Sequence, residues 1–404
     1  MPPPLLLIDA RVNAMPGAHG LARSVVQLAA HAAAADGDGA GHDGAHHGGA
    51  DHDGARVAAL VCTGRRQLFS LESLAAHADL IETSIGIGAV HRSGQLSALI
   101  RRTGAAVMYA PYPLFAPLRC PCPLVVAIHD VTMENDASFA GGWHRQAGLK
   151  IVTGAMVRRA AAVTAPTQAT LAGIRSVYPR ARCLTLVPNG VDTRAFAAAD
   201  DARVARARRA YGLPGRFVLA VGAHRPHKNF PVLVRALTAL PADLSLVVVG
   251  QPDPRFRGLP EALAALAAEL GVAARVLLVP EVSDDLLPAV YRAATVAAFP
   301  SLAEGYGLPA LEALAAEVPL LVSDIPVLAE VCGDAAVHVP PADPAAWAAA
   351  ITALLADPAG ARRRIQAGAA IAAQADWQHG GQALRRLLLS VATSTAHNAR
   401  RALP

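Results

Sequence analysis

Short apolar runs alternate with segments of helical spacing along the second half of the chain, and this alternation constrains the fold more than any other feature. Each run is too short for an ordinary helix and is apolar almost throughout, as expected of a strand buried on both faces of a sheet. The rhythm predicts an α/β domain in which helices cover a parallel sheet. The predicted strands are 217–221, 245–249, 275–279, 295–299, 319–323 and 336–339, and the predicted helices are 230–240, 260–270, 284–293, 308–317 and 344–356.

The first half of the chain repeats this pattern more loosely. Because 404 residues exceed what one ordinary core accommodates, the two halves predict two α/β domains. We place the first domain at 1–190, the second at 191–376, and in 377–404 a terminal helix that returns to the first domain. The predicted strands of the first half are 5–9, 57–61, 106–109, 125–128, 162–165 and 184–187, with helices at 19–34 and 143–161.

Composition limits the class of protein and the cellular compartment that we expect. It is 53% hydrophobic and 17% charged, which is typical of a globular protein. None of its apolar runs reaches the roughly 18 to 20 residues that a membrane-spanning helix needs, and the N-terminal segment does not resemble a signal peptide. The 5 cysteines are scattered, so we expect a reducing cytoplasm. Within Cys120-Pro121-Cys122, two buried thiols are favoured over a zinc site.

The chain carries a formal net charge of +5, with arginines clustered at 203–209 and 362–364. No aromatic side chains are interleaved with them to stack bases, so nucleic acid is not an expected partner. A solvated helix face is the favoured interpretation of the clusters. An anionic membrane surface or a phosphorylated substrate ranks second, and the former would place the protein peripherally at the inner face of the membrane.

A tract of glycine, alanine, aspartate and histidine occupies 36–55 and cannot contribute to a core. We expect an exposed insertion between the first helix and the second strand. Its histidines could bind zinc or nickel weakly, but a tract of this composition supplies no fixed ligand geometry, so we predict no functional metal site there.

Ligands of parallel sheets bind beyond the carboxyl ends of the strands, and the segment after Phe299 has the features of such a site. Gly305 and Gly307 would let a ligand approach the backbone closely. The helix that starts near Pro309 would offer free N–H groups to phosphate oxygens. Glu304 would lie in the loop, and a helical carboxylate such as Glu312 could accept hydrogen bonds from a ribose diol. Helix capping alone would account for one glutamate, but not for the glycines and the proline as well.

The motif Pro-Ser-x-x-Glu-Gly-Tyr-Gly-Leu-Pro at 300–309, followed by Glu312, resembles the signature of the family-4 retaining glycosyltransferases, known as glycosyl transferases group 1. This resemblance implies the GT-B fold: two Rossmann-like domains whose parallel sheets face each other across a cleft. One position departs from the family, which often has glycine where this chain has Glu317, and that difference would alter packing or the wall of the donor pocket. The likeness continues through 187–192, 221–222, 226–229, 323–326, 330–336 and 341–343.

The resemblance also implies roles for individual residues. Glu312 would hold the nucleotide ribose, and Glu304 would contact hydroxyls of the donor sugar. The backbone from Gly305 through Tyr306 and Gly307 to Leu308 would bind the diphosphate.

Two cations follow the strand that ends at Val221 and could neutralise the departing nucleoside diphosphate. Lys228 matches the lysine of the family. Arg225 does not match its arginine, because that position is Ala223 here. Arg225 could substitute from a shifted position or be a surface residue, and the sequence favours neither.

In the first domain, His129 lies at the carboxyl end of a predicted strand. The pair His129-Asp130 resembles a family motif in which the histidine contacts the donor sugar, and we favour that role over a structural one. The segment Gly17-Ala18-His19-Gly20 resembles the glycine loop that faces acceptor and diphosphate, although it departs from the usual Gly-Gly-x-Gly form.

The resemblance implies a retaining transfer of a sugar from a nucleotide-sugar to a saccharide or lipid-linked acceptor, as in polysaccharide biosynthesis. The leaving phosphate would take the acceptor's proton. No Asp-x-Asp motif follows a strand, so we expect metal independence and no cofactor beyond the co-substrate. The amino-acid sequence of 226–229 is similar to that of mannosyltransferase-like members of the family and favours GDP-mannose over a UDP-sugar. Two alternatives are a nucleotide-sugar epimerase of the same fold and a catalytically silent subunit of a polysaccharide-assembly complex.

Overall fold

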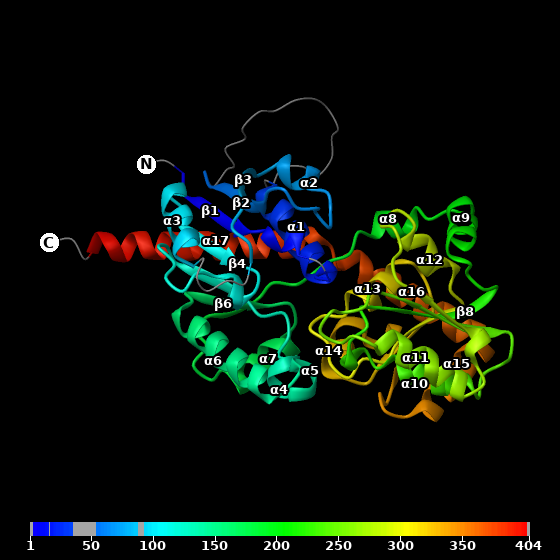
Figure 1. The fold of residues 1–404 in the computed structure, drawn as a ribbon. Helices are drawn as coiled ribbons and strands as arrows, with labels where there is room; N and C mark the ends of the chain where they lie inside the picture. The colour runs from blue at the N-terminus through cyan, green and yellow to red at the C-terminus, as the bar shows by residue number, and fades with distance from the viewer. Residues whose placement is uncertain (1–2, 16, 35–53, 88–92, 402–404) are drawn as a thin grey trace. The chain divides into compact units, whose positions relative to one another are not determined.

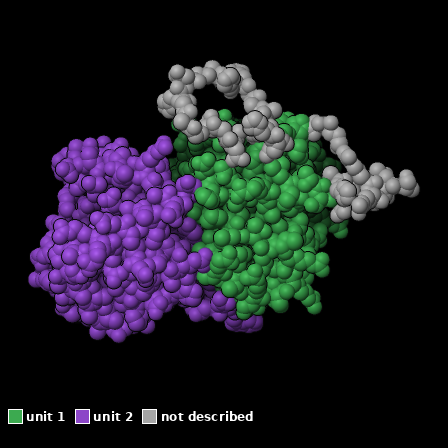
Figure 2. Space-filling view, turned by 180° about the vertical axis from the view of Figure 1, so that it is seen from behind, with its two compact units in different colours: residues 1–131, 147–189, 377–404 green, residues 132–146, 190–376 purple. Residues whose placement is uncertain are grey.

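The computed structural model describes residues 3–15, 17–34, 54–87 and 93–401, and it describes side chains as far as 394. The chain forms two compact units, coloured separately in Figure 2. Unit 1 comprises Met1–Val131, Ala147–Asn189 and Trp377–Pro404, and unit 2 comprises Thr132–Gln146 and Gly190–Asp376. Most of the histidine-rich tract at 36–55 lies outside the described residues. No helix among the described residues is both long and apolar enough to span a bilayer.

Unit 1 is built on a parallel sheet with the strand order β3-β2-β1-β4-β5-β6-β7. The order reverses between β1 and β4, and such a reversal opens a crevice at the carboxyl edge of the sheet. The strands are β1 (Leu5–Asp9), β2 (Arg56–Cys62), β3 (Asp79–Thr83), β4 (Val107–Ala110), β5 (Leu124–Ala127), β6 (Ala162–Ala165) and β7 (Leu184–Leu186). The longer helices of this half of the chain are α1 (His19–Ala33), α3 (Ser93–Thr103), α6 (Trp143–Arg159) and α7 (Gln168–Val177), and the shorter ones are α2 (Glu72–Ala75), α4 (Thr132–Asn135) and α5 (Ala137–Ala140). Of these, α4, α5 and the first residues of α6 belong to unit 2.

Unit 2 is built on a second parallel sheet, with the order β10-β9-β8-β11-β12-β13. Its strand order reverses between β8 and β11. The strands are β8 (Arg216–Val221), β9 (Leu244–Val249), β10 (Val276–Val279), β11 (Val296–Phe299), β12 (Leu320–Ser323) and β13 (Val337–Val339). The helices are α8 (Thr193–Ala197), α9 (Asp201–Tyr211), α10 (Phe230–Leu237), α11 (Leu259–Glu269), α12 (Leu287–Ala293), α13 (Leu308–Ala315), α14 (Pro326–Cys332), α15 (Pro344–Ala356) and α16 (Pro358–Gln374).

Alternate residues of β8 pack into separate cores on the two faces of the second sheet. Phe217 and Leu219 belong to one core, and Val218 and Ala220 belong to the other. Because both faces are covered, the strands are apolar at nearly every position. The α/β class and the two parallel sheets predicted from the alternation are confirmed.

The C-terminal helix α17 (Trp377–Arg401) packs against α1 in unit 1 (Figure 1). A Cβ atom on Gly380 would lie 2.1 Å from the carbonyl oxygen of Pro188, so only glycine allows this close approach. Arg385 is buried and donates to the carbonyl oxygens of Ala32 at 2.9 Å and Ala55 at 3.3 Å. These hydrogen bonds join α17 to α1 and to the segment that leads into β2.

Candidate functional site

The loops after β8 and β11 lie side by side at the carboxyl edge of the second sheet, because these two strands are neighbours and run in parallel. The backbone N–H of Leu302 donates to the carbonyl oxygen of His227 at 2.7 Å. The side chain of Asn229 donates to the carbonyl oxygens of Pro300 at 3.1 Å and Pro341 at 2.7 Å. Three loops are therefore held together where the strand order predicts a ligand.

An ion pair links the two loops. Lys228 Nζ donates to Glu304 Oε1 at 2.6 Å, and the side chains are only 14% and 12% exposed. Ser301 Oγ donates to the same carboxylate oxygen at 2.7 Å. Burial alone would raise the pKa of Glu304, but the positive charges of Lys228 and His227 and these hydrogen bonds outweigh it, so the pKa is lowered. Glu304 is therefore an ionised carboxylate at neutral pH.

Gly222 gives the Lys228 side chain room to lie along the backbone. Its φ is +155°, and a Cβ atom there would come within 3.3 Å of Lys228 Cε. Gly250, which follows β9, lets the backbone of Gly222 approach closely, because a Cβ atom on Gly250 would lie 1.8 Å from the carbonyl oxygen of Gly222. Gly222 therefore leaves room for the lysine, and Gly250 lets the loop after β8 pass close to the end of β9.

The segment 305–308 turns the second loop into α13. Gly307 adopts φ +87°, and a Cβ atom on it would lie 2.6 Å from Leu328 Cδ2, so only glycine fits. No side chain caps the first turn of α13, which starts at Leu308 with proline in that turn. A helix terminus of this kind presents N–H groups and partial positive charge to an anion. Tyr306 packs against the core, and burial raises its pKa further, so its side chain remains neutral.

Glu312 lies on α13 and is only 6% exposed. Tyr291, a fully buried residue of α12, donates its hydroxyl to Glu312 Oε2 at 2.8 Å. The ring of Tyr291 packs edge-to-face on Phe196, with centroids 5.6 Å apart. The glutamate is thereby held in one orientation by a residue that the sequence analysis missed. The sequence did offer one signal for Tyr291: it lies in a segment predicted as a helix, and a buried phenol needs a hydrogen-bond partner.

Arg225 is held by a carboxylate in the loop that follows β9. Its Nε donates to Asp253 Oδ2 at 2.7 Å, and Arg255 binds the same carboxylate through contacts of 3.0 and 2.7 Å. The Asp253 side chain is 6% exposed. Burial would raise the pKa of Asp253, but the two arginines lower it strongly. Asp253 therefore fixes two guanidinium groups beside the loop after β8, and sequence reasoning overlooked it.

In unit 1, His129 follows β5, as predicted. Its Nε2 atom is buried and has no hydrogen-bond partner among the described residues. Burial lowers the pKa of His129, and the Asp130 carboxylate and a hydrogen bond to the Pro111 backbone oppose this only in part. The imidazole is therefore neutral at physiological pH, and the hydrogen-bonding capacity of its buried Nε2 is unmet among the described residues.

The predicted glycine loop precedes and opens α1. Gly17 has φ +76°, a conformation that favours glycine. His19 and Gly20 form the first turn of α1, and the His19 ring packs edge-to-face on Phe69 with centroids 6.3 Å apart. The loop therefore has the backbone freedom expected of it, while the imidazole of His19 has an aromatic neighbour.

Sequence reasoning also missed a buried ion pair at the end of β1. Asp9 and Arg11 are 0% and 2% exposed and form two side-chain hydrogen bonds, at 2.8 and 2.7 Å. Arg11 also donates to the carbonyl oxygens of Ile85 and Phe115, both at 3.2 Å. The pair consequently ties together loops that follow three strands of the first sheet. A buried ion pair with its hydrogen bonds satisfied fixes the positions of these loops, whatever its net contribution to the free energy of unfolding.

The arginine clusters make contacts that favour a structural interpretation. Arg206 forms an exposed ion pair with Asp285. Arg208 donates to the carbonyl oxygen of Ala293 at 3.0 Å, and Arg364 donates to that of Asp334 at 2.7 Å. These residues hold helix ends of unit 2, and contact with an anionic membrane stays a prediction.

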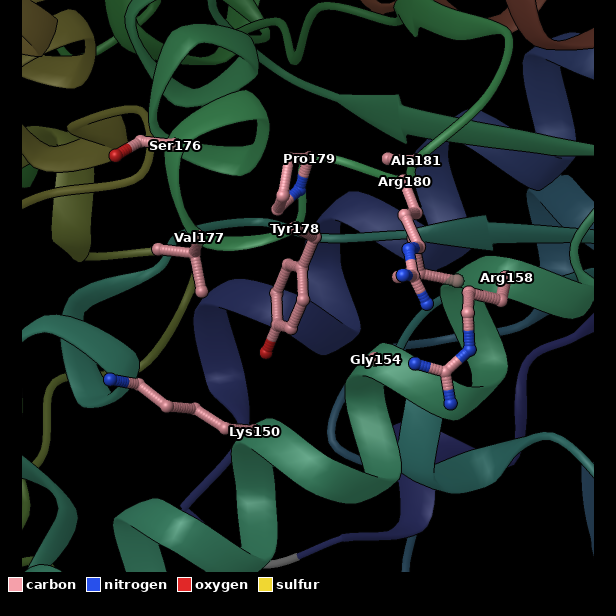
Figure 3. Close-up of a pocket in the computed structure, with 10 residues that line it drawn as sticks. Lys150, Gly154, Arg158, Ser176, Val177, Tyr178, Pro179, Arg180 and Ala181 are labelled. Atoms are coloured by element: carbon pink, nitrogen blue, oxygen red, sulfur yellow. The ribbon is translucent and has the colours of Figure 1, made fainter.

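Within the described part of the chain, no group of three His, Cys, Asp or Glu side chains is placed to hold a metal ion. A cavity of about 650 Å³ in unit 1 (Figure 3) is lined by residues of α6 and by the segment from α7 towards β7, including Lys150, Arg158 and Arg180. None of the predicted site residues lines it.

Comparison with known proteins assigns residues 205–370 to a family. Residues 205–370 match the family model for glycosyl transferases group 1. The D-inositol 3-phosphate glycosyltransferase of Acidothermus cellulolyticus is 36% identical over 262 residues, which cover 61% of this chain and 57% of that protein. The protein of the same name from Nocardia farcinica is 34% identical over 277 residues, covering 65% of this chain and 60% of its own length. The chain thus spans less than two thirds of these relatives.

Solved structures agree with the observed architecture. Sucrose-phosphate synthase from Thermosynechococcus elongatus superposes with a TM-score of 0.73 at 22% identity, covering 99% of this chain and 98% of that one. Anabaena HepE in complex with UDP-glucose superposes with a TM-score of 0.71 at 18% identity, covering 96% and 99%. At such identities the likeness establishes the fold. The chain has the GT-B fold, and its residues 205–370 belong to the glycosyl transferases group 1 family.

Proposed function

We propose that this chain is a retaining glycosyltransferase that moves a sugar from a nucleotide-sugar to a saccharide or lipid-linked acceptor. The observation that carries the proposal is the buried Lys228–Glu304 pair at the carboxyl edge of the second sheet, next to the uncapped start of α13. A lysine, an ionised carboxylate and a helix N-terminus are the components needed to bind a diphosphate and a sugar together.

The diphosphate is assigned to the start of α13 and to the nearby cations. The backbone of Gly305, Tyr306, Gly307 and Leu308 donates to its oxygens, and Lys228 offsets the charge that develops as the nucleoside diphosphate leaves. Arg225 contributes positive potential from its position on Asp253. Because Asp253 is shared with Arg255, the three groups together keep a net positive charge beside the loop.

The two glutamates bind the other parts of the donor, namely the ribose and the sugar. Glu312 binds the nucleotide ribose, since Tyr291 holds one carboxylate oxygen and thereby orients the group. Glu304 contacts hydroxyls of the donor sugar, and its bond to Lys228 couples sugar and phosphate recognition. A tightly held carboxylate favours one pattern of hydroxyl groups over another, because unmatched buried polar groups are costly.

Residues of unit 1 supply the remaining contacts in this proposal. His129 accepts a hydrogen bond from a hydroxyl of the donor sugar through its orphaned Nε2, because the other ring nitrogen donates to the Pro111 carbonyl. Gly17, His19 and Gly20 line the acceptor and phosphate side. The leaving phosphate takes the acceptor's proton, so the reaction needs neither a separate protein base nor a bound metal ion.

The donor is GDP-mannose or a UDP-sugar. The amino-acid sequence of residues 226–229 favours GDP-mannose. The names of the matched relatives add phosphorylated inositol to the acceptors worth testing, next to saccharides and lipid-linked sugars.

A label-transfer assay tests the proposal. The full chain is incubated with radiolabelled GDP-mannose or UDP-glucose and each acceptor class, alongside Glu304→Gln, Lys228→Ala and the surface control Asp243→Asn. Label in an acceptor, lost in the first two variants and kept in the control, supports the transferase. An altered sugar without acceptor indicates an epimerase, and absence of donor binding or turnover indicates a silent subunit; either result overturns the proposal.

A further inference from the structure

Three sulfur atoms gather in unit 1, away from the residues assigned to donor and acceptor. Cys120 Sγ lies 3.8 Å from Cys122 Sγ and 3.9 Å from Met108 Sδ. Met108 is a fully buried residue of β4, while both cysteines are half-buried in the segment that leads into β5. The sequence places the two thiols together, but only the fold adds the thioether.

Strand pairing and helix contacts hold this cluster in place. Met108 pairs with Leu124 in the β4–β5 register, and its backbone N–H donates to the carbonyl oxygen of Pro123 at 2.9 Å. The segment just before Cys120 is tied to α3, because Ser97 Oγ donates to the carbonyl oxygen of Arg119 at 2.6 Å. The sulfur positions are therefore set by backbone hydrogen bonds on both sides and not by the thiols themselves.

The spacing of the sulfur atoms matches that of ligands around one metal ion. A metal–sulfur bond of about 2.3 Å places neighbouring ligand sulfurs about 3.8 Å apart. Thiolate and thioether ligands select soft ions such as Cu(I), whereas structural zinc almost always takes four ligands from Cys, His or carboxylates. Those further zinc ligands are lacking here, since no three His, Cys, Asp or Glu side chains cluster among the described residues.

We propose that Cys120, Cys122 and Met108 form a binding site for a soft monovalent metal ion, Cu(I), with two thiolates and one thioether as ligands. Binding releases the two thiol protons to the solvent and changes no oxidation state. The site lies between β4 and the segment leading into β5, so a bound ion cross-links this part of the first sheet.

A basic neighbour balances the charge of such a site. Two thiolates around a monovalent ion carry one net negative charge, and the positively charged Arg159 guanidinium acts on Cys120.

Competition with a chromophoric chelator tests the proposal. The reduced full-length protein is titrated into the Cu(I)–bicinchoninate complex under anaerobic conditions, and the loss of colour reports the copper taken up. We expect one equivalent per chain. X-ray absorption of the loaded protein should show sulfur neighbours at about 2.3 Å and no nitrogen shell. Cu(I) should also raise the melting temperature, because it binds the folded form.

Matched variants separate this site from other thiols. Cys120→Ser with Cys122→Ser should abolish the tight equivalent, and Met108→Leu should weaken it at least tenfold while leaving the melting temperature of the metal-free protein nearly unchanged. Cys183→Ser removes an exposed thiol elsewhere in the unit and should have no effect. Copper uptake that is equal in the double variant and the wild type, or no tight equivalent in the wild type, would overturn the proposal.

Discussion

Lys228 and Glu304 form a buried ion pair between the loops after β8 and β11, with 2.6 Å between Nζ and Oε1. Their positions are separated by 76 residues in the chain and meet because the two strands are neighbours in the sheet. Neither side chain exposes more than 14% of its surface. The pair is thus both the centre of the proposed donor site and a constraint on how the loops pack.

Removal of the lysine alone should be costly. Lys228→Ala leaves Glu304 buried without its counter-charge, and loss of one partner of a buried pair lowers the free energy of unfolding by about 3 kcal/mol. The double variant Lys228→Ala/Glu304→Ala should be less destabilised than the sum of the two single variants. Urea unfolding measures all three. Arg216→Ala breaks an exposed pair with Asp243 and should change little; equal costs for Lys228→Ala and Arg216→Ala would contradict the account.

A fall in pH should lower the free energy of unfolding more in the wild type than in a variant that lacks the Glu304 carboxylate. The folded-state pKa of Glu304 is lowered, so the folded protein binds this proton less readily than the unfolded chain. Its contribution to the free energy of unfolding is complete above the unfolded value of about 4.3 and is lost as the pH falls through the folded pKa. Between about pH 5 and pH 3, the wild type should lose more stability than Glu304→Gln. Parallel pH curves would exclude a lowered pKa at Glu304.

Tyr291→Phe should impair donor binding without large loss of fold. The change removes the hydroxyl that orients Glu312, at a stability cost of about 1–2 kcal/mol for the lost hydrogen bond. We expect KM for the nucleotide-sugar to rise several-fold, with a smaller effect on kcat. Tyr211→Phe is the matched control, since its hydroxyl contacts Ser283 at an exposed position. An unchanged KM in Tyr291→Phe would show that Glu312 does not need this support.

Glu317→Gly should stabilise the protein. Glu317 ends the turn after α13 with φ +58°, the left-handed region that non-glycine residues adopt at a cost. Its exposed side chain makes no contact that this change would remove from the core. Thermal unfolding should show a gain of about 0.5–1 kcal/mol. Glu317→Ala keeps the strain and should show no gain; the same gain in both variants would point to the lost charge instead.

Apolar periodicity predicted most strands because both faces of each sheet are buried. It missed β3, whose sequence Asp-Leu-Ile-Glu-Thr mixes polar and apolar residues at the edge of the first sheet. The motif around Glu304 and Glu312 could be found because its members are close in sequence. The family likeness of 205–370 confirms the class of protein that this motif indicated.

Groups that support the site could not be predicted, because their partners are distant in the chain. Tyr291 meets Glu312 only through the packing of α12 on α13, and Asp253 meets Arg225 only through the pairing of β8 with β9. Likewise, Arg11 binds the Phe115 carbonyl at a separation of 104 residues. Spacing along the sequence contains no information on such contacts, whereas the strand order of the folded sheets creates them.

Proton NMR of the reaction tests the central claim most directly. The wild type is incubated with its preferred nucleotide-sugar and acceptor in the presence of EDTA, and the anomeric signals of donor and product are followed together. The account predicts a product with the anomeric configuration of the donor, release of nucleoside diphosphate without added metal, and a rate about a hundredfold lower in Glu304→Gln. An inverted product, an epimerised sugar-nucleotide, or turnover unaffected by Glu304→Gln would contradict it.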